Sequence, residues 1–185
     1  QLNMAPALRQ HYKGAPDDAI VACVLVLLFP KNDDWHFTLI QRMPHEKDRH
    51  SGQISFPGGR LEDDDDSFVA GALREVEEEV GISRDEINVL GRLTELYIPV
   101  SNFLVHPFVG FLEKLPEFIP QPSEVDNILE IPIKELNKNE NKKTKDMKGG
   151  ENIVLKNVPY FDFDGKVVWG ATAMMLSEFE RVVFG

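Results

Sequence analysis

The chain has 185 residues, of which 20 are basic and 31 acidic, so its formal net charge at pH 7 is −11. This length fits one soluble domain with little room for a second large one, and a composition of 42% hydrophobic and 28% charged residues argues against a largely disordered chain. The acidic balance also opposes non-specific binding to nucleic acid, because a phosphate backbone attracts basic surfaces.

The first third of the sequence predicts a β-hairpin. The apolar runs Ala19–Phe29 and Trp35–Arg42 flank the turn-forming segment Pro30–Asp34. The first run has about half of the roughly 20 residues that a membrane-spanning helix needs, so no membrane partner is expected. Cys23, the single cysteine, lies inside this run, which predicts burial and excludes a disulfide framework. No secretory signal pattern is seen at the start, so the cytoplasm is the expected location.

A short strand, a loop and a helix are predicted next. Gln53–Phe56 alternates in polarity and runs into Pro57-Gly58-Gly59, where we expect the strand to stop and a loop to begin. From Ser67 to Val80 the apolar positions follow helical spacing, and Gly81 stands where a C-terminal cap is expected. This segment gives the strongest helix signal in the chain.

The rest of the chain indicates more strands and one closing helix. Lys138–Gly150 is polar and Lys-rich, which predicts a surface-loop insertion, and Ala171–Val183 predicts an amphipathic helix. Few helices among mixed strands indicate a single α/β (α+β) domain over residues 1–185, in which helices cover a sheet. The expected strands, the last two of them joined by the turn Asp164-Gly165, are Asn88–Val100, Phe103–Leu112, Ile128–Ile133, Val158–Phe163 and Lys166–Trp169.

Three carboxylates are spaced to gather on one side of the predicted helix. At about 100° per residue, Glu75, Glu78 and Glu79 fall within about 100° of one another and point away from the apolar arc. Their mutual repulsion would be relieved by a divalent cation, and hard cations such as magnesium take oxygen ligands. Arg74 is positioned to brace one glutamate by a bidentate pair, and Gly58-Gly59 lets the backbone approach a metal or phosphate. The plain alternative is a solvated, charged helix face.

Two stretches resemble the Nudix box, a loop-helix-loop pattern of hydrolases that cleave a nucleoside diphosphate linked to another group. They are Gly58–Glu62 and Arg74–Ile82, within a box of about residues 58–82, and the second matches its half of the pattern at every fixed position. The first half is one residue longer than the commonest form, and Asp66 occupies the place of the isolated glutamate of the box. The resemblance implies an α/β/α sandwich with a mixed sheet.

A similar extra residue occurs in the coenzyme A pyrophosphatase branch of that family. Leu39–Arg42 and Gly52–Gly59 resemble the upstream signature of the branch, an apolar-Gln-Arg strand followed by Gly-Gln-x-x-Phe-Pro-Gly-Gly. Ile40 stands where a threonine is usual. Segments that resemble later parts of the same branch are Pro107–Gly110, Ser123–Val125 and Trp169–Ala173.

The resemblance implies a role for each matched residue. Glu75, Glu78 and Glu79 with the Gly58 carbonyl would bind Mg²⁺ or Mn²⁺, and Arg74 would orient a glutamate. The base that takes a proton from water would be one of these glutamates or Glu124, and the sequence does not choose between them. The residues expected near the substrate phosphates are Gly59, Arg42 and Arg49, with Lys47 and His50 as further candidates. His45, His50 and His106 are not spaced as a metal pair.

Three functions follow as hypotheses. The first is hydrolysis of coenzyme A or acyl-coenzyme A to 3′,5′-ADP and a phosphopantetheine product. The second is hydrolysis of another nucleoside diphosphate derivative such as ADP-ribose, and the third is a non-catalytic domain that binds a nucleotide and regulates a partner. In each hypothesis, the expected ligand is a small-molecule nucleotide and not a nucleic acid. Whether the chain forms a homodimer is left open.

Overall fold

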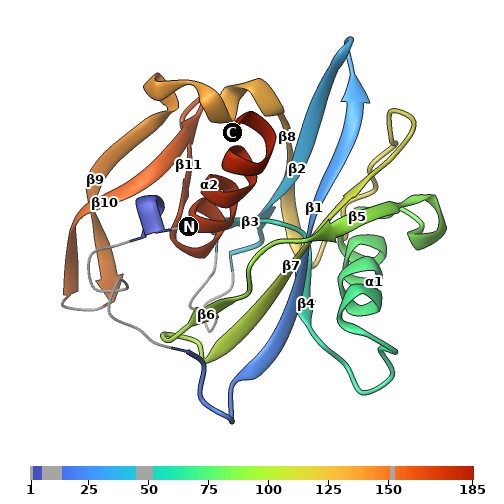
Figure 1. Cartoon of the computed structure of the whole chain (residues 1–185), viewed down its shortest axis with the longest axis horizontal. Helices are drawn as coiled ribbons and strands as arrows, with labels where there is room; N and C mark the ends of the chain where they lie inside the picture. The colour runs from blue at the N-terminus through green and yellow to red at the C-terminus, as the bar shows by residue number, and fades with distance from the viewer. Residues whose placement is uncertain (1, 6–13, 45–51, 151–152) are drawn as a thin grey trace. The chain divides into compact units, whose positions relative to one another are not determined.

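The computed structural model of the chain describes residues 2–5, 14–44, 52–150 and 153–185 (Figure 1). Its residues group into two units, Ala15–Ile133 and a second unit made of Gln1–Gly14 with Lys134–Gly185. The first unit holds the box. That both units belong to a single domain stays a prediction. No helix in the described ranges is long and apolar enough to cross a membrane.

The described part of the first unit is built on one mixed sheet of eight strands. Its main order is β3-β2-β1-β7-β5, with β4 paired to β1, β6 to β7 and β8 to β2. The central strands β1 and β7 run parallel, and the other pairs are antiparallel. The strands are β1 (Ile20–Lys31), β2 (Asp34–Arg42), β3 (Ile54–Ser55), β4 (Gly58–Arg60), β5 (Asn88–Arg92), β6 (Leu96–Ile98), β7 (Phe103–Phe111) and β8 (Val125–Pro132).

The predicted hairpin and strands are largely confirmed. β1 and β2 pair around Asn32 and Asp33, whose φ angles of 53° and 59° make the tight turn. The strand expected at Asn88–Val100 is instead two strands that both pair with β7, because β5 ends at Arg92 and β6 begins only at Leu96. β8 begins before its expected start, since it follows β2 as far as Arg42.

Helix α1 (Phe68–Val80) lies against one face of this sheet (Figure 1), and a short 3₁₀ helix, η3 (Arg84–Glu86), follows it. The Ser67 hydroxyl accepts the Ala70 N–H at 3.2 Å, and Gly81 ends α1 in the left-handed conformation with φ of 73°. The buried Val76 packs with Cys23 of β1 in the core. The expected burial of Cys23 is thus confirmed, and burial raises the pKa of its thiol to about 12.

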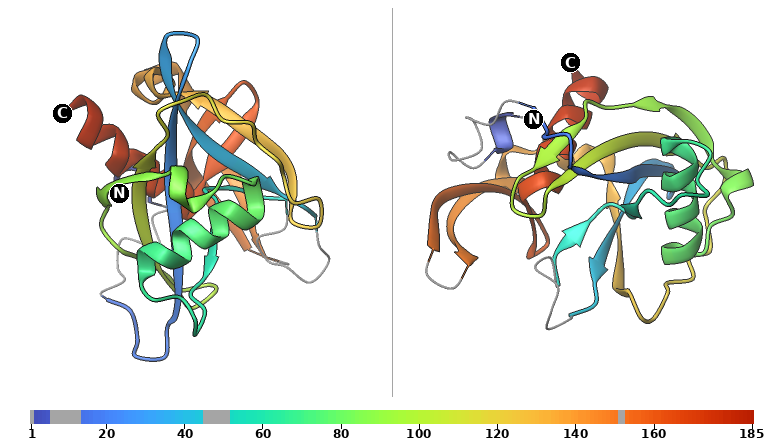
Figure 2. Two further views of the ribbon diagram at one scale, coloured as in Figure 1. Left: turned by 90° about the vertical axis from the view of Figure 1, so that its right-hand side faces the viewer. Right: turned by 90° about the horizontal axis from the view of Figure 1, so that it is seen from below.

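In its described residues, the second unit is a three-stranded antiparallel sheet in the order β11-β10-β9 with one α-helix, α2, that packs on β10 and β11 (Figure 2). The hairpin around Asp164-Gly165 and the closing helix are confirmed. The elements are η1 (Leu2–Met4), η4 (Ile133–Asn137), η5 (Asn139–Asn141), β9 (Lys142–Gly150), β10 (Ile153–Phe163), β11 (Lys166–Trp169) and α2 (Gly170–Phe184).

The loop predicted for Lys138–Gly150 is wrong, because this segment forms η5 and the strand β9. β9 pairs along β10, with Lys142 opposite Phe161 and Lys143 opposite Tyr160. Lys143 reaches Asp162 at 2.8 Å, and the Lys145 ammonium lies 4.9 Å from the centre of the Tyr160 ring. A strand with few apolar side chains is therefore held by its backbone ladder and by partners on β10.

Candidate active site

The Gly58-Gly59 pair forms part of strand β4, where a loop was expected. Gly58 lies opposite Val24 and Gly59 opposite Cys23 in an antiparallel pairing with β1. Gly58 has a φ of 152°, and a Cβ built on it would lie 2.3 Å from the carbonyl oxygen of Cys23. Only glycine therefore lets this backbone come so close to β1. The loop was expected because glycine usually weakens a strand, whereas here the close approach requires it.

The Glu79 side chain lies next to Gly58 and is buried, with 1% of the residue exposed. The Gly58 N–H donates to one oxygen of its carboxylate at 2.8 Å, and the Arg42 guanidinium lies 3.8 Å from the other. Burial raises the pKa of Glu79 to about 8, the Gly58 N–H and Arg42 act in the opposite direction, and the charges of Glu75 and Glu124 add to the rise. The expectation that Glu79 points away from the core is wrong, because β4 supplies a donor there.

Glu75 lies beside Gly59. A Cβ built on Gly59 would lie 2.3 to 2.7 Å from the atoms of the Glu75 carboxyl group, so the missing side chain makes room for that group. Burial raises the pKa of Glu75, Arg74 opposes the rise, and the charges of Glu78 and Glu124 add to it. Glu78 is the outermost of the three helix glutamates, with 57% of its side chain exposed.

Arg74 connects these carboxylates to the segment before α1. One terminal nitrogen donates to Glu75 and to Glu78, both at 3.0 Å, and the other donates to the Arg60 carbonyl at 2.9 Å. The bidentate pair expected with a glutamate is instead made with Asp65, at 3.0 and 3.1 Å. This pairing raises the pKa of Arg74 and lowers that of Asp65.

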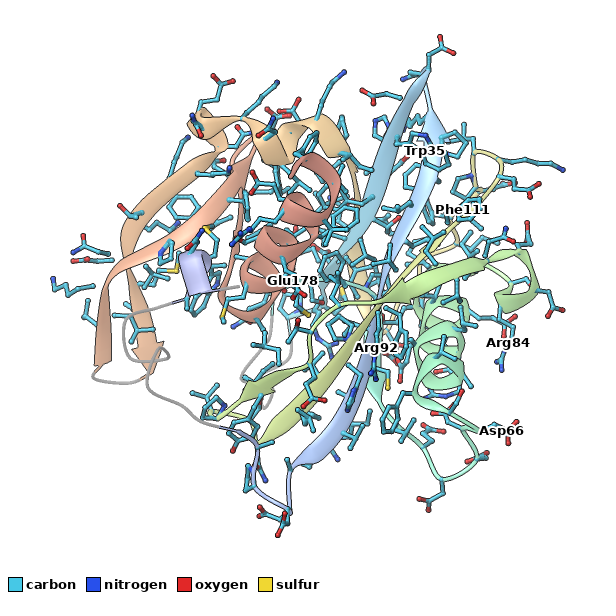
Figure 3. The ribbon with its side chains drawn as sticks, in the orientation of Figure 1. Trp35, Asp66, Arg84, Arg92, Phe111 and Glu178 are labelled. Atoms are coloured by element: carbon cyan, nitrogen blue, oxygen red, sulfur yellow. The ribbon has the colours of Figure 1, made fainter. Side chains whose placement is uncertain are left out.

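Asp65 is a residue of the site that sequence reasoning missed. Asp66 was placed at the isolated glutamate of the pattern, yet Asp66 is exposed on the outside of the loop before α1 (Figure 3). The sequence did contain a signal for this. The box loop has one extra residue, so the pattern alone does not decide whether Asp65 or Asp66 takes the place of the isolated glutamate.

The segment that carries Glu124 is fastened to the end of α1. The N–H groups of Ile119 and Gln121 donate to the carbonyls of Val80 and Glu79, both at 2.9 Å, and the Met43 N–H donates to the carbonyl of Glu124 at 2.8 Å. Glu124 itself is exposed, and its charge raises the pKa of both Glu75 and Glu79. The structure therefore brings Glu124 into the electrostatic neighbourhood of the helix glutamates.

Other candidates lie elsewhere or outside the described residues. Arg49, with Lys47, His45 and His50, falls in the segment that the structure does not describe. His106 stacks on Phe68 with ring centres 4.2 Å apart and lies 3.9 Å from Glu95. Phe111 lies edge-on to Trp35 (Figure 3).

The donor set fits a hard divalent cation in its chemistry. Glu75, Glu78, Glu79 and the Gly58 carbonyl offer only oxygen, and Gly59 leaves a space for the Glu75 carboxyl group that a Cβ would fill. Within the described ranges, however, no three acidic, histidine or cysteine side chains are already grouped to hold a metal ion. The expected convergence of all three carboxylates is therefore not met, because Glu79 is held under Gly58 and Glu78 is held outside by Arg74.

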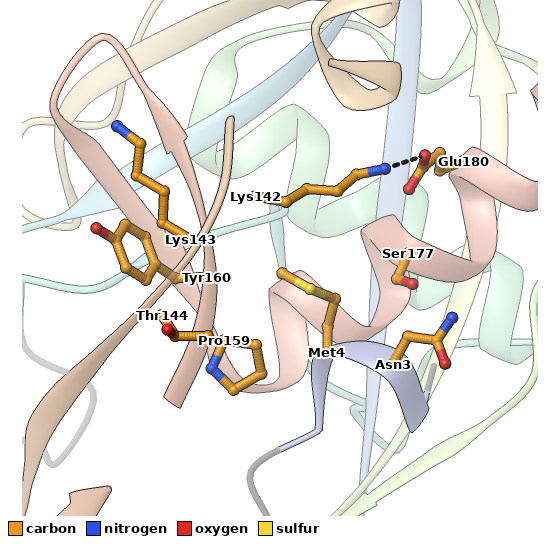
Figure 4. A pocket seen from close by; sticks show the side chains of 9 residues that line it. All are labelled: Asn3, Met4, Lys142, Lys143, Thr144, Pro159, Tyr160, Ser177 and Glu180. Atoms are coloured by element: carbon orange, nitrogen blue, oxygen red, sulfur yellow. Dashed lines mark hydrogen bonds and ion pairs between the residues drawn. The ribbon is translucent and has the colours of Figure 1, made fainter. Parts of the chain in front are cut away.

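A cavity of about 640 Å³ lies in the second unit (Figure 4), and none of the predicted site residues lines it. Lys142 and Glu180 form an ion pair of 2.5 Å along its wall, and Ser177 and Met4 also line it. Lys142 is paired with Glu180, and Lys143, which also lines the cavity, is paired with Asp162, so the candidate chemistry rests with the box residues.

A family model for the NUDIX domain matches residues 20–149 of the chain. A similar protein is Nudix hydrolase 15, mitochondrial, of Arabidopsis thaliana, which is 30% identical over 88% of this chain and 58% of its own length. The chain spans between 55% and 60% of the length of the first curated relatives it matches.

Two solved structures share the fold. One is a binary complex of a C. elegans Ap4A hydrolase, with a TM-score of 0.53, 16% identity and coverage of 62% of this chain and 81% of that one. The other is the NUDIX domain of Shewanella oneidensis NrtR in complex with ADP-ribose, with a TM-score of 0.50, 17% identity and coverage of 69% and 79%. At this identity they confirm the expected mixed α/β fold alone.

Proposed function

Because the chain belongs to the Nudix family, we propose that it is a metal-dependent hydrolase that cleaves the pyrophosphate bond of a nucleoside diphosphate derivative. The observation that carries this proposal is the placement of two α1 carboxylates against the glycine strand: Glu79 accepts the Gly58 N–H at 2.8 Å, and the Glu75 carboxyl group occupies the space beside Gly59. The charges of Glu78 and Glu124 add to the raised pKa of Glu75, and that of Glu124 also adds to the raised pKa of Glu79. Such concentrated negative charge next to a closely packed glycine backbone suits a divalent ion and a phosphate substrate.

Each residue has a proposed role. Glu75, Glu78, Glu79 and the Gly58 carbonyl hold Mg²⁺ or Mn²⁺, which when bound neutralises phosphate charge and makes a water more acidic. Arg74 keeps Glu75 and Glu78 in place through its contacts at 3.0 Å. One of the helix glutamates or Glu124 takes the proton of the water that attacks phosphorus, and the phosphorus–oxygen bond to the leaving phosphate breaks.

Arg42 is the proposed phosphate-binding side chain among the described residues. Its guanidinium lies 3.8 Å from Glu79 and about a third of its side chain, 32%, is exposed, so it borders the carboxylate group and also reaches solvent. Guanidinium suits phosphate oxygens because it is planar and always charged. Arg49 and Gly59 complete the proposed substrate contacts.

Coenzyme A or its acyl derivatives are the proposed substrate, with 3′,5′-ADP and a phosphopantetheine compound as products. The support is the resemblance of Leu39–Arg42 and Gly52–Gly59 to the coenzyme A pyrophosphatase branch. ADP-ribose is the second candidate, because a structural neighbour of the same fold binds it. A nucleotide-binding domain without activity is the third, and the retained Glu75, Glu78 and Glu79 count against it.

The test compares coenzyme A and ADP-ribose at equal concentration with Mg²⁺ or Mn²⁺, and measures the nucleotide product. Glu78→Gln should abolish turnover. The matched control is Glu77→Gln on the same helix, which loses only an exposed ion pair with Arg84 of 2.8 Å and should keep its activity. Equal activity of the Glu78→Gln variant and the parent protein would refute the metal site. A nucleotide that raises Tm without any product would instead support the non-catalytic reading.

A further inference from the structure

Arg60 directly follows the glycine pair in β4, and its side chain is exposed. The two other arginines described around the site face carboxylates: Arg42 lies 3.8 Å from Glu79, and Arg74 pairs with Asp65 at 3.0 Å. Arg60, in contrast, forms no ion pair with a carboxylate of the described residues. Within that part of the chain, the charge of Arg60 is therefore available to an external anion.

The Arg60 side chain is held in place by a contact that needs no acid. Its guanidinium carbon lies 5.4 Å from the centre of the Phe103 ring on β7, which is a cation–π contact. The carbonyl of Arg60 accepts an N–H of Arg74 at 2.9 Å, so the backbone at this position is tied to the site. Because a phenyl ring offers no oxygen acceptor, the N–H groups of the Arg60 side chain are left for water or for a ligand.

Arg60 and Glu75 lie on opposite sides of β4. The space of the missing Gly59 side chain is turned toward Glu75, on the side of α1. Successive residues of a strand point to opposite faces, so Arg60 points away from α1, which agrees with its contact to Phe103 across β1. An anion bound by Arg60 is therefore a different group from the pyrophosphate at the proposed metal site.

One such group distinguishes the two candidate substrates. Coenzyme A and ADP-ribose both contain a pyrophosphate, but the ribose of coenzyme A also carries a phosphate on its 3′ oxygen, and ADP-ribose carries none. A guanidinium suits this phosphate because it is planar, always charged and able to donate two parallel N–H bonds to two oxygens.

We propose that Arg60 binds a phosphate group of the substrate outside the pyrophosphate, the 3′-phosphate of coenzyme A, and that Phe103 holds the guanidinium ready for it. The inference rests on the proposed hydrolase function and deepens it, since it makes Arg60 a determinant of specificity for coenzyme A over ADP-ribose. Arg60 binds the substrate and takes no part in breaking the bond. Its loss should therefore raise KM and leave kcat nearly unchanged.

The test compares coenzyme A with 3′-dephospho-coenzyme A, which differ only in this phosphate, in the presence of Mg²⁺. The parent protein should have a kcat/KM about tenfold or more higher for coenzyme A, the size expected of a hydrogen bond between charged groups. Arg60→Gln should lose most of this preference through a higher KM for coenzyme A alone, and Phe103→Leu should lose part of it. The matched control is Arg92→Gln, which removes the same charge from an exposed position on β5 and should keep the preference.

Failure of this proposal can be told apart from failure of the proposed function. Equal kcat/KM for the two compounds in the parent, or an unchanged preference in Arg60→Gln, would overturn the role of Arg60 while the hydrolase stands. If the parent cleaves neither compound, the proposed substrate is wrong, and binding of 3′,5′-ADP and of 5′-AMP, measured by calorimetry, decides about Arg60. The parent should then bind 3′,5′-ADP about tenfold more tightly than Arg60→Gln does, with equal affinities for 5′-AMP. Equal affinities of parent and variant for 3′,5′-ADP would overturn the proposal.

Discussion

Replacing Glu79 by glutamine should make the metal-free protein more stable at alkaline pH. The pKa of Glu79 rises from 4.5 to about 8 on folding, mainly because the carboxyl group is buried. Between these pH values the folded protein binds more protons than the unfolded chain, so the free energy of unfolding falls as the pH rises. At about 1.4 kcal/mol for each pH unit, the ionised carboxylate costs roughly 4–5 kcal/mol above pH 8.

Glutamine mimics the protonated carboxyl group and can still accept the Gly58 N–H. The stability of Glu79→Gln should therefore equal that of the parent near pH 4.5 and exceed it by about 4 kcal/mol at pH 8.5. The assay is urea unfolding in the presence of a chelator at several pH values. The exposed Glu78→Gln serves as the control, with a change of less than about 1 kcal/mol. A Glu79→Gln variant that is less stable than the parent at pH 8.5, or a difference independent of pH, would refute the reasoning.

Three further changes test the backbone that surrounds the site. Gly59→Ala should displace the Glu75 carboxyl group, which a Cβ would approach to 2.3 Å, and reduce kcat/KM at least about tenfold, as steady-state kinetics would show. Gly81→Ala should destabilise the chain by about 1–2 kcal/mol or more, because its φ is 73° and its Cβ would lie 2.7 Å from Ile119; chemical denaturation measures this. Ser67→Ala removes the N-terminal cap of α1 and should cost about 1 kcal/mol by the same method. An unchanged unfolding midpoint in either stability variant would contradict the assigned cap.

The features that were predicted correctly depend on residues close together in sequence. Ser67 and Gly81 predict the two ends of α1, because a capping residue interacts with the backbone within one helical turn. The turn at Asn32 and Asp33 and the turn at Asp164-Gly165 were predictable for the same reason. Local hydrogen bonding thus sets most of the element boundaries that the sequence reveals.

The features that were missed depend on distant partners. The burial of Glu79 follows from the Gly58 N–H, 21 residues away in sequence, which becomes available only when β4 pairs with β1. Likewise, Asp65 and Asp66 are the same residue type in one acidic run, and only the loop that bonds Glu62 to Asp65 selects which of them meets Arg74. β9 forms from a Lys-rich segment because β10 supplies its ladder. A helical wheel contains none of this information.

The metal site is tested most directly by anomalous diffraction from crystals soaked with Mn²⁺. One peak should appear between Gly58 and the α1 glutamates, about 2.0–2.6 Å from oxygens of Glu75, Glu78 or Glu79. Glu79 would connect the ion to the glycine backbone. A peak in another part of the chain would contradict a metal-dependent pyrophosphohydrolase built on these residues. The absence of a peak beside Gly58, in a crystal in which Arg74 still bonds Glu75 and Glu78, would contradict it as well.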